Sequence, residues 1–297
     1  MTISPPPSIS LKGALLTLAS AASVAMTYIA SKQAMADLSP LAFAPIWFGV
    51  ASLWGLGFYL LRNGVKLPPG LVEVSRPILW LGLLNGLANF LFFTAVDLGD
   101  PTLASFFGRS ETVYTVLLGA LLLSERMRRY QWLGVAVAVF GAGIMTFRAG
   151  PVVWTMLGIL LVSNFFLSVS SLIAKQYIHV VEPLVLSTAR NIVMAVLLAL
   201  AGLVAGQLAW PNLVAWEWII AGSFFGPFVS YVLFYQGLRY IDLSKGAVIR
   251  ASQPIFVALY SLALFGVFIT APQFVGGLLM VAGVGLMLWN SHVKRNV

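Results

Sequence analysis

Cysteine is missing from this sequence of 297 residues, and charged residues and histidines are scarce. Without cysteine the chain can form neither disulfides nor thiolate metal sites. Only 9% of its residues are charged, compared with about 25% in ordinary soluble domains. The two histidines, His179 and His292, lie near the ends of apolar segments, and no His, Asp and Glu cluster has metal-ligand spacing. These shortages exclude a soluble globular domain and argue against a metal site.

Nucleotide-binding motifs are absent too. The Gly141-Ala142-Gly143 and Gly283-Val284-Gly285 segments lack the third glycine of a dinucleotide loop, and nothing matches a P-loop. We therefore expect no cofactor and no ATP-driven pumping by this chain alone. A membrane enzyme acting on lipids would need ionisable groups clustered at headgroup depth, and the sequence shows no such cluster. The sequence predicts that the protein is not an enzyme.

Long hydrophobic segments dominate the chain. Hydrophobic residues make up 60% of it, and its mean hydropathy is +0.95. A membrane-spanning helix needs about 20 mostly apolar residues. Ten stretches qualify, at about Lys12 to Met35, Leu41 to Leu61, Pro77 to Leu98, Thr102 to Ser124, Gln131 to Arg148, Thr155 to Ile178, Leu184 to Gly206, Trp216 to Leu238, Gly246 to Ile269 and Pro272 to Asn290. Because these runs are continuously apolar rather than alternating, they predict an all-α integral membrane protein with ten transmembrane helices.

The chain also repeats itself. Lys32-Gln33 recurs 143 positions later as Lys175-Gln176, and each pair is followed by a proline seven residues after its glutamine. At a spacing of 142, Phe92 matches Phe234 and Ser110 matches Ser252. Five spans fall in each half, so we predict two five-helix repeats, at residues 1–149 and 150–297. Because five is odd, the repeats are inverted, which predicts a site near the midplane and alternating access.

The distribution of basic residues predicts the orientation. With a cytoplasmic amino terminus, twelve of the 17 Lys and Arg residues lie at the inner face, namely Lys12, Arg62, Lys66, Arg76, Arg126, Arg128, Arg129, Lys175, Arg239, Lys245, Lys294 and Arg295. Only Lys32 and Arg148 lie outside. This asymmetry follows the positive-inside rule and predicts that both termini are cytoplasmic. The net charge of +8 therefore reflects orientation, and no nucleic-acid partner is expected.

The first span raises one alternative, because Ala34-Met35-Ala36 resembles a signal-peptidase site. The apolar run before it exceeds the usual ~7 to 15 residues of a signal peptide. Its segment from Ser20 to Pro40 also has a counterpart from Ser163 to Pro183. We expect the first span to be retained as part of the repeat.

Several features together resemble a known family. They are ten predicted spans in two halves, glycine-patterned fifth and tenth helices, and Ser124-Glu125-Arg126 after the fourth span. The chain resembles the drug/metabolite transporter superfamily, in its ten-helix branch with tandem EamA domains, and within it bacterial exporters of the aromatic amino-acid type. The Ser-Glu-Arg turn is similar to the usual Gly-Glu-Arg of that branch, whereas the second half departs with Phe265-Gly266-Val267. The resemblance implies a central cavity between the first, third and fourth helices and the sixth, eighth and ninth.

Polar and aromatic residues at helical spacing provide the candidates for this cavity. Residues three or four apart share a helix face, as do Asn85 and Asn89, or Arg250 and Gln253. Glu111 aligns with Gln253 across the repeat, and Tyr114 shares its face. The candidate substrate-binding residues are Tyr28, Asn85, Asn89, Phe93, Arg109, Glu111, Tyr114, Tyr231, Tyr235, Arg250 and Gln253.

Charged residues within spans need compensation, because each costs about 2.5–3.5 kcal/mol at a helix centre. A zwitterionic substrate could supply it, with its ammonium at Glu111 and its carboxylate at Arg250. Structural roles stay open as alternatives: Arg250 and Arg190 can snorkel to the interface, and Arg109 can be a structural partner. The aromatic candidates serve helix packing equally well.

The sequence thus predicts a secondary transporter in the bacterial inner membrane that carries small metabolites, with amino acids favoured. Drugs, sugars or nucleotide-derived metabolites are the alternative cargo, and a passive channel is the alternative mechanism. The expected partners are a small-molecule substrate and the lipid bilayer. A monomer is sufficient, because one chain contains both halves.

Overall fold

The computed structural model describes residues 10–99, 104–105, 107–108, 110–123, 129–144, 151–266 and nine positions between 271 and 286. All regular secondary structure in these residues is helical. Seven helical segments of the described chain are long and apolar enough to cross a membrane. The prediction of a helical integral membrane protein agrees with this architecture.

The membrane-spanning segments begin and end within a few residues of the predicted spans. They are α1 (Leu11–Ala34), α2 (Pro40–Asn63), α3 (Ser75–Leu98), α7 (Pro151–Tyr177), α8 (Pro183–Val204), the continuous segment α9 (Leu213–Ser223), η1 (Phe224–Ser230) and α10 (Tyr231–Leu238), and the pair α11 (Leu243–Arg250) and α12 (Gln253–Phe265). Two shorter helices are α5 (Ser110–Leu122) and α6 (Arg129–Ile144). The predicted spans at 102–124, 131–148 and 272–290 include positions outside the described residues, so the count of ten stays a prediction.

Local sequence explains several helix starts. Proline occupies the first position of α2 and of α8, where its missing N–H costs no hydrogen bond. Ser39 caps α2, because its Oγ accepts a hydrogen bond from the Ala42 N–H at 3.2 Å. Asn212 caps α9 in the same way, accepting from the Ala215 N–H at 2.8 Å. These caps define the chain entry points at one end of the bundle.

Of the three prolines Pro45, Pro227 and Pro254, which lie within spans, two accompany irregular backbone. Pro227 lies in the seven-residue π-helix η1, consistent with the proline's inability to donate an intrahelical hydrogen bond. The Pro227 carbonyl accepts a hydrogen bond from Asn191 Nδ2 of α8 at 3.1 Å. Pro254 follows the break at Ala251 and Ser252 between α11 and α12. Helix α2, by contrast, is continuous through Pro45.

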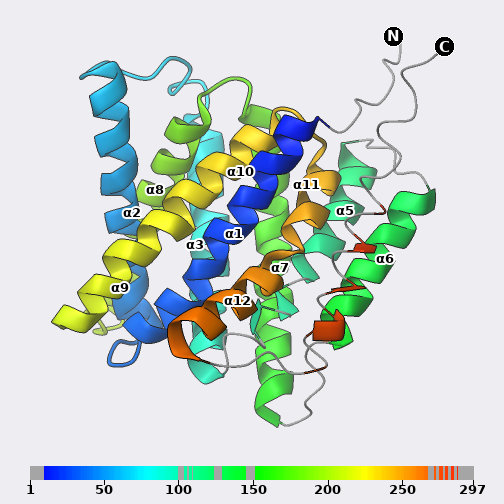
Figure 1. Ribbon diagram of the computed structural model, residues 1–297. Helices are drawn as coiled ribbons and strands as arrows, with labels where there is room; N and C mark the ends of the chain where they lie inside the picture. The colour runs from blue at the N-terminus through cyan, green and yellow to red at the C-terminus, as the bar shows by residue number, and fades with distance from the viewer. Residues whose placement is uncertain are drawn as a thin grey trace.

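The part of the chain before residue 150 packs mainly against the part after it. Helix α2 contacts α8 most extensively, and α3 packs on α7 and α8. Helix α1 runs through the middle of the bundle and contacts α9, η1, α10, α11 and α12 (Figure 1). The two parts therefore form one intermixed bundle rather than two separate lobes.

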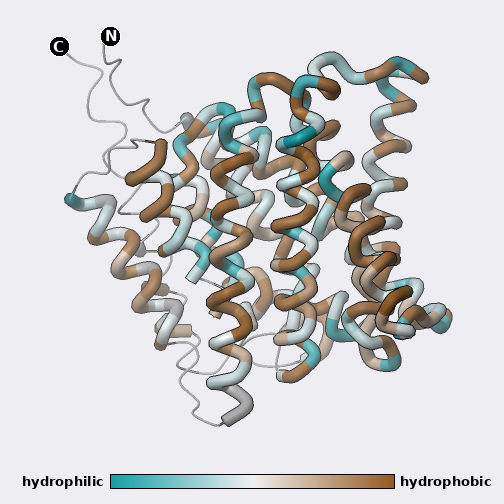
Figure 2. Tube along the Cα trace, turned by 180° about the vertical axis from the view of Figure 1, so that it is seen from behind, coloured by the Kyte–Doolittle hydropathy of each residue, from teal (hydrophilic) through white to brown (hydrophobic). Residues whose placement is uncertain are grey.

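The outer surface of the bundle is apolar. Large hydrophobic side chains such as Leu53, Leu203 and Phe140 are more than 60% exposed. Hydrophobic residues extend along the lengths of the outward helices, as seen in Figure 2. In water this exposure would be unfavourable, but in a bilayer the same side chains face lipid tails. The fold is that of a multi-pass membrane protein.

One end of the bundle collects positive charge. Lys12 at the start of α1 lies 4.7 Å from the centroid of the Tyr240 ring, so α1 starts beside the turn between α10 and α11. The connections after α2 and α7 meet at the same end, where Arg62 Nη1 is 2.7 Å from Glu182 Oε1. We call this the basic end, and its described basic residues include Lys12, Arg62, Lys66, Arg76, Lys175, Arg239 and Lys245.

Matched lysines cap helix ends at opposite ends of the bundle. Near the end of α1, Lys32 Nζ donates to the carbonyls of Val96 and Asp97 at the end of α3, at 3.1 and 2.9 Å. Its repeat counterpart Lys175 donates to the carbonyl of Leu238 at the end of α10 and, at 2.7 Å, to that of Ile241 just beyond it. A cation near a helix C-terminus is stabilising because the carbonyl dipoles point at it.

At the basic end, Arg239 extends from the turn after α10 to the turn after α7. Its Nε and Nη2 donate to the carbonyls of Ile178 and Val181, at 2.7 and 3.0 Å. Between these residues, the pKa of His179 lies below its ordinary value because partial burial and the nearby Lys175 and Arg239 charges disfavour the imidazolium. The turns that follow α7 and α10 are thus joined by side-chain hydrogen bonds to backbone carbonyls.

Glycines allow α1 to approach α9 and η1 closely. A Cβ built on Gly222 would overlap Ala30 Cβ and the Trp47 ring. Small residues at helix contacts are the usual means of close packing in membranes. The glycine-patterned fifth and tenth helices of the sequence prediction lie partly outside the described residues.

We expect Gly222→Ala to lower the thermal stability of the purified protein, because relieving the overlap costs about 1–3 kcal/mol in a packed core. Gly158→Ala in α7 is the matched control, since a Cβ there meets nothing within 4 Å. Thermal unfolding followed by size-exclusion recovery measures both. Equal recovery of the two variants would show that the α1–α9 contact tolerates a methyl group.

Candidate functional site

A cavity lined by polar and apolar side chains lies between helices of both parts of the chain. From the first part it is lined by Val24, Thr27, Tyr28, Trp47, Phe48, Asn89, Phe92 and Glu111, and from the second by Asn164, Leu167, Gly226, Pro227, Tyr231, Arg250 and Gln253. The lining thus combines a carboxylate, a guanidinium and three amides with aromatic rings. This is the chemistry of a site for a small polar molecule with an apolar portion.

Glu111 is positioned by a set of hydrogen bonds between α5 and α7. Asn164 Nδ2 donates to the Phe107 carbonyl at 2.9 Å and to Ser110 Oγ at 2.8 Å. One turn on, Ser168 Oγ donates to the Glu111 carbonyl at 3.0 Å. These contacts hold the backbone at Glu111 and leave its carboxylate at the cavity. No ion pair joins that carboxylate to any residue in the described part of the chain.

Two buried arginines border the cavity toward the basic end. The Arg190 guanidinium carbon lies 3.6 Å from the centroid of the Tyr231 ring, and that of Arg250 lies 4.4 Å from the Phe234 ring and 5.4 Å from the Tyr231 ring. Cation-π contacts of this kind stabilise a guanidinium away from water. Arg190 also donates to Tyr235 Oη at 3.2 Å and to Asn191 Oδ1 at 2.8 Å. We call Arg190, Tyr231, Phe234, Tyr235 and Arg250 the arginine-aromatic layer.

Neither arginine reaches the interface. Arg190 is fully buried and Arg250 is 7% exposed. The snorkelling alternative therefore does not describe this conformation. The described hydrogen-bond partners of Arg190 are neutral and lie within the bundle, which favours the structural alternative. Arg250 lines the cavity.

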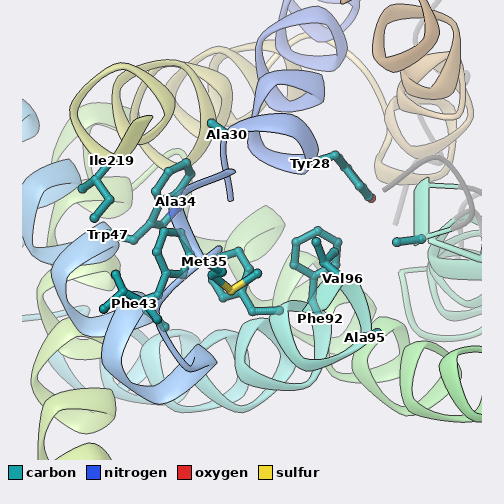
Figure 3. Close-up of a cluster of buried hydrophobic side chains, with 14 of the residues drawn as sticks. Tyr28, Ala30, Ala34, Met35, Phe43, Trp47, Phe92, Ala95, Val96 and Ile219 are labelled. Atoms are coloured by element: carbon teal, nitrogen blue, oxygen red, sulfur yellow. The ribbon is translucent and has the colours of Figure 1, made fainter. Parts of the chain in front are cut away.

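Aromatic rings from α1, α2 and α3 form a cavity wall away from the basic end. The Tyr28 ring meets Phe92 edge-on, with centroids 4.9 Å apart. Phe93 is packed edge-on against Phe43 at 4.9 Å, and Phe43 contacts Trp47 at 5.0 Å. Figure 3 shows Tyr28 and Phe92 within this cluster of buried side chains. Edge-on packing of this kind gives a rigid apolar surface beside the polar groups.

The structure brings six of the sequence candidates to the cavity. They are Tyr28, Asn89, Glu111, Tyr231, Arg250 and Gln253. Their role in binding a substrate stays a prediction. Arg109 lies outside the described residues.

The other four candidates lie behind or beside the cavity lining. Asn85 is buried one turn before Asn89 and donates to the Leu81 carbonyl and to Ser170 Oγ. Phe93 is fully buried among the aromatic rings, and Tyr235 is the hydrogen-bond partner of Arg190. Tyr114 is half-buried and meets Phe165 edge-on at 5.8 Å. Helix packing accounts for all four positions in this conformation.

Sequence reasoning missed Asn164 and Thr27 as lining residues. Asn164 is an amide within a predicted span, which is the signal that selected Asn85 and Asn89. Thr27 gave no such signal, because threonines in membrane helices often bond their own backbone. Phe48 and Phe92 could not be separated from ordinary packing residues by sequence.

The cavity is small in this conformation. Its volume is about 50 Å³, compared with about 300–1,000 Å³ in typical ligand pockets. A single water needs about 10–15 Å³ of such space, so the cavity has room for a few waters. Binding a metabolite here requires the surrounding helices to move apart.

A helical membrane bundle with a cavity between its helices is typical of transport proteins, and comparisons with known proteins agree. The model of the EamA-like transporter family matches residues 11–147 and again residues 154–289. This chain belongs to the EamA-like transporter family, within the drug/metabolite transporter superfamily. It is accordingly a membrane transporter and not an enzyme.

Individual relatives agree at lower similarity. The chain is 31% identical over 119 residues to a probable amino-acid metabolite efflux pump of Escherichia coli, a match that covers 32% of this chain and 40% of that protein. It is 24% identical over 228 residues to an uncharacterized transporter of Archaeoglobus fulgidus, covering 75% and 81% of the two chains. A solved crystal structure matches the fold with a TM-score of 0.78 at 18% identity, over 97% of this chain and 100% of the other.

Proposed function

We propose that this protein is a secondary transporter that carries small metabolites, amino acids above all, across the inner membrane of a bacterium by alternating access. The observation that carries the proposal is one cavity lined by both Glu111 and Arg250. An amino acid bears an ammonium and a carboxylate, and these two groups complement it. The aromatic wall near Tyr28 provides a surface for an apolar side chain.

Alternating access rests on an inverted repeat of two five-helix halves, residues 1–149 and 150–297. Three observations support the repeat: the family model matches twice, the spacing of 143 recurs, and Lys32 and Lys175 cap equivalent helix ends. Inverted repeats produce equivalent gates toward the two sides of the membrane. The small cavity then corresponds to a state closed around the midplane site.

The orientation is part of the proposal. With the basic end facing the cytoplasm, the chain obeys the positive-inside rule and both termini are cytoplasmic. The relative from Escherichia coli is named as an efflux pump, which favours export as the direction of net flux. A monomer is sufficient, because the proposed site uses residues of a single chain.

Uptake into liposomes that contain the purified protein tests the function. We expect saturable, time-dependent uptake of particular labelled amino acids, inhibited by unlabelled amino acids and absent from empty liposomes. Inhibition by drugs, sugars or nucleotides alone would mean that the transported substrate belongs to one of those classes. Flux that rises linearly with substrate concentration and shows no exchange would mean that the protein is a channel rather than a carrier.

A further inference from the structure

The contact between α2 and α8 has an apolar groove at each end. At the basic end the groove has a volume of about 320 Å³, and its lining includes Leu56, Tyr59, Lys66, Val185 and Ile192. At the opposite end the groove measures about 580 Å³, and its lining includes Pro45, Val196 and Trp210. Because both open on the outer surface of a membrane bundle, lipid chains are the molecules that surround them.

The two grooves are made from equivalent positions of the chain. Leu56, Val65, Lys66 and Leu67 of the first groove correspond, 143 residues on, to Ala199, Leu208, Ala209 and Trp210 of the second. In the same way Pro45 and Ile46 of the second groove correspond to Thr188 and Ala189 of the first. The same site is therefore built twice, once at each end of the α2–α8 contact.

Charge distinguishes the two sites. Lys66 is replaced by Ala209 in the second groove, and Arg62, at the end of α2, corresponds to Ala205. Only the groove at the basic end thus has cationic side chains at these positions. Arg62 is paired with Glu182 at 2.7 Å, yet its side chain is 69% exposed, and a guanidinium has five N–H donors.

The segment that holds Lys66 is fixed in place. Tyr59 Oη donates to the Lys66 carbonyl at 3.0 Å. Gly70, with φ of +74°, lets the chain pass close to the Val180 carbonyl of the turn before α8, where a Cβ would lie 2.8 Å from that oxygen. In Figure 1 this connection lies at the same end of the bundle as the start of α8. Its apolar side chains Val65 and Val72 are 96% and 73% exposed, which suits contact with lipid.

We propose that the groove at the basic end binds an anionic phospholipid, such as phosphatidylglycerol, with an acyl chain along α2 and α8 and its phosphate at Lys66 and Arg62. Basic pockets between transmembrane helices recognise anionic headgroups in this way. The groove at the opposite end accepts acyl chains without selecting the headgroup. This inference does not depend on which substrate the protein transports.

Native mass spectrometry of the purified protein, with added dioleoyl phosphatidylglycerol or dioleoyl phosphatidylcholine, tests the site. We expect tighter retention of the anionic lipid, weakened about fivefold by Lys66→Gln and further by Arg62→Gln. Glu182→Gln should tighten binding, because it removes the acidic group beside the phosphate. Ala189→Trp should weaken binding of both lipids, because its ring would fill the groove.

Two controls separate this site from general surface charge. Arg76→Gln removes an exposed charge at the same end but outside the groove lining, and should leave binding unchanged. Ala209→Lys should create a second preference for the anionic lipid at the opposite groove. Equal retention of the two lipids, or an equal loss with Arg76→Gln and Lys66→Gln, would overturn the proposal.

Discussion

Replacing Glu111 by glutamine is expected to reduce the rate of amino-acid transport by at least tenfold while leaving the protein folded. The carboxylate lines the cavity and has no ion-pair partner in the described part of the chain. A hydrogen bond to a charged group contributes about 1.5–3 kcal/mol, which corresponds to about 10–150-fold in binding. Folding should survive, because Asn164 and Ser168 contact the backbone and Ser110 rather than the Glu111 carboxylate.

Initial uptake rates in liposomes with matched protein amounts measure this effect. Glu217→Gln is the control, because Glu217 is an acid in α9 outside the cavity lining. Unchanged uptake kinetics in Glu111→Gln would remove this residue from the site. The same variant separates two modes of transport. If protons drive wild-type uptake through Glu111, the response of uptake to a pH gradient should disappear in Glu111→Gln. If transport is facilitated diffusion, neither protein should respond to a pH gradient.

Arg250→Gln is expected to raise the KM for amino acids by about 10–100-fold. The guanidinium lines the cavity and is held against the Phe234 and Tyr231 rings, so it is presented in a fixed orientation to a substrate carboxylate. Arginine binds carboxylates through two parallel hydrogen bonds, which glutamine cannot reproduce. Arg250→Lys should be intermediate, because it retains the charge without the planar pair of donors.

Competition by amines tests the assignment directly. An amine that lacks the carboxylate of its parent amino acid should inhibit wild-type and Arg250→Gln transport with similar strength. The parent amino acid should lose most of its inhibition in the variant. Equal changes for amine and amino acid would mean that Arg250 acts on the structure of the cavity rather than on the carboxylate.

Helical periodicity could place residues on a face but could not say what covers that face. Asn85 and Asn89 share a side of α3, as their spacing predicts, yet only Asn89 lines the cavity. Asn85 lies one turn away against Ser170 of α7. Tyr231 and Tyr235 divide in the same way: Tyr231 lines the cavity, whereas Tyr235 is buried and accepts a hydrogen bond from Arg190 of α8. Such differences depend on side chains more than 40 positions away in the chain.

The buried arginines also show what sequence reasoning could not predict. Sequence identified Arg190 and Arg250 as costly within spans but left their compensation open. Their compensation includes aromatic rings of α10, with neutral hydrogen-bond partners for Arg190 as well. A cation-π contact has no sequence signature when its partners lie on different helices, because tyrosine and phenylalanine are common throughout membrane spans.

The sequence by itself determined that the chain is a helical membrane protein and where its described spans begin and end, because a bilayer requires every backbone group to be satisfied within an apolar helix. It also determined the uneven distribution of basic residues and the repeat spacing of 143. Only the tertiary structure decided which polar residues meet at the cavity, which arginine is fully buried, and how α2 and α8 form paired grooves. The reason is that membrane helices are individually apolar on most faces, so their neighbours are selected by small differences in packing and hydrogen bonding between distant residues.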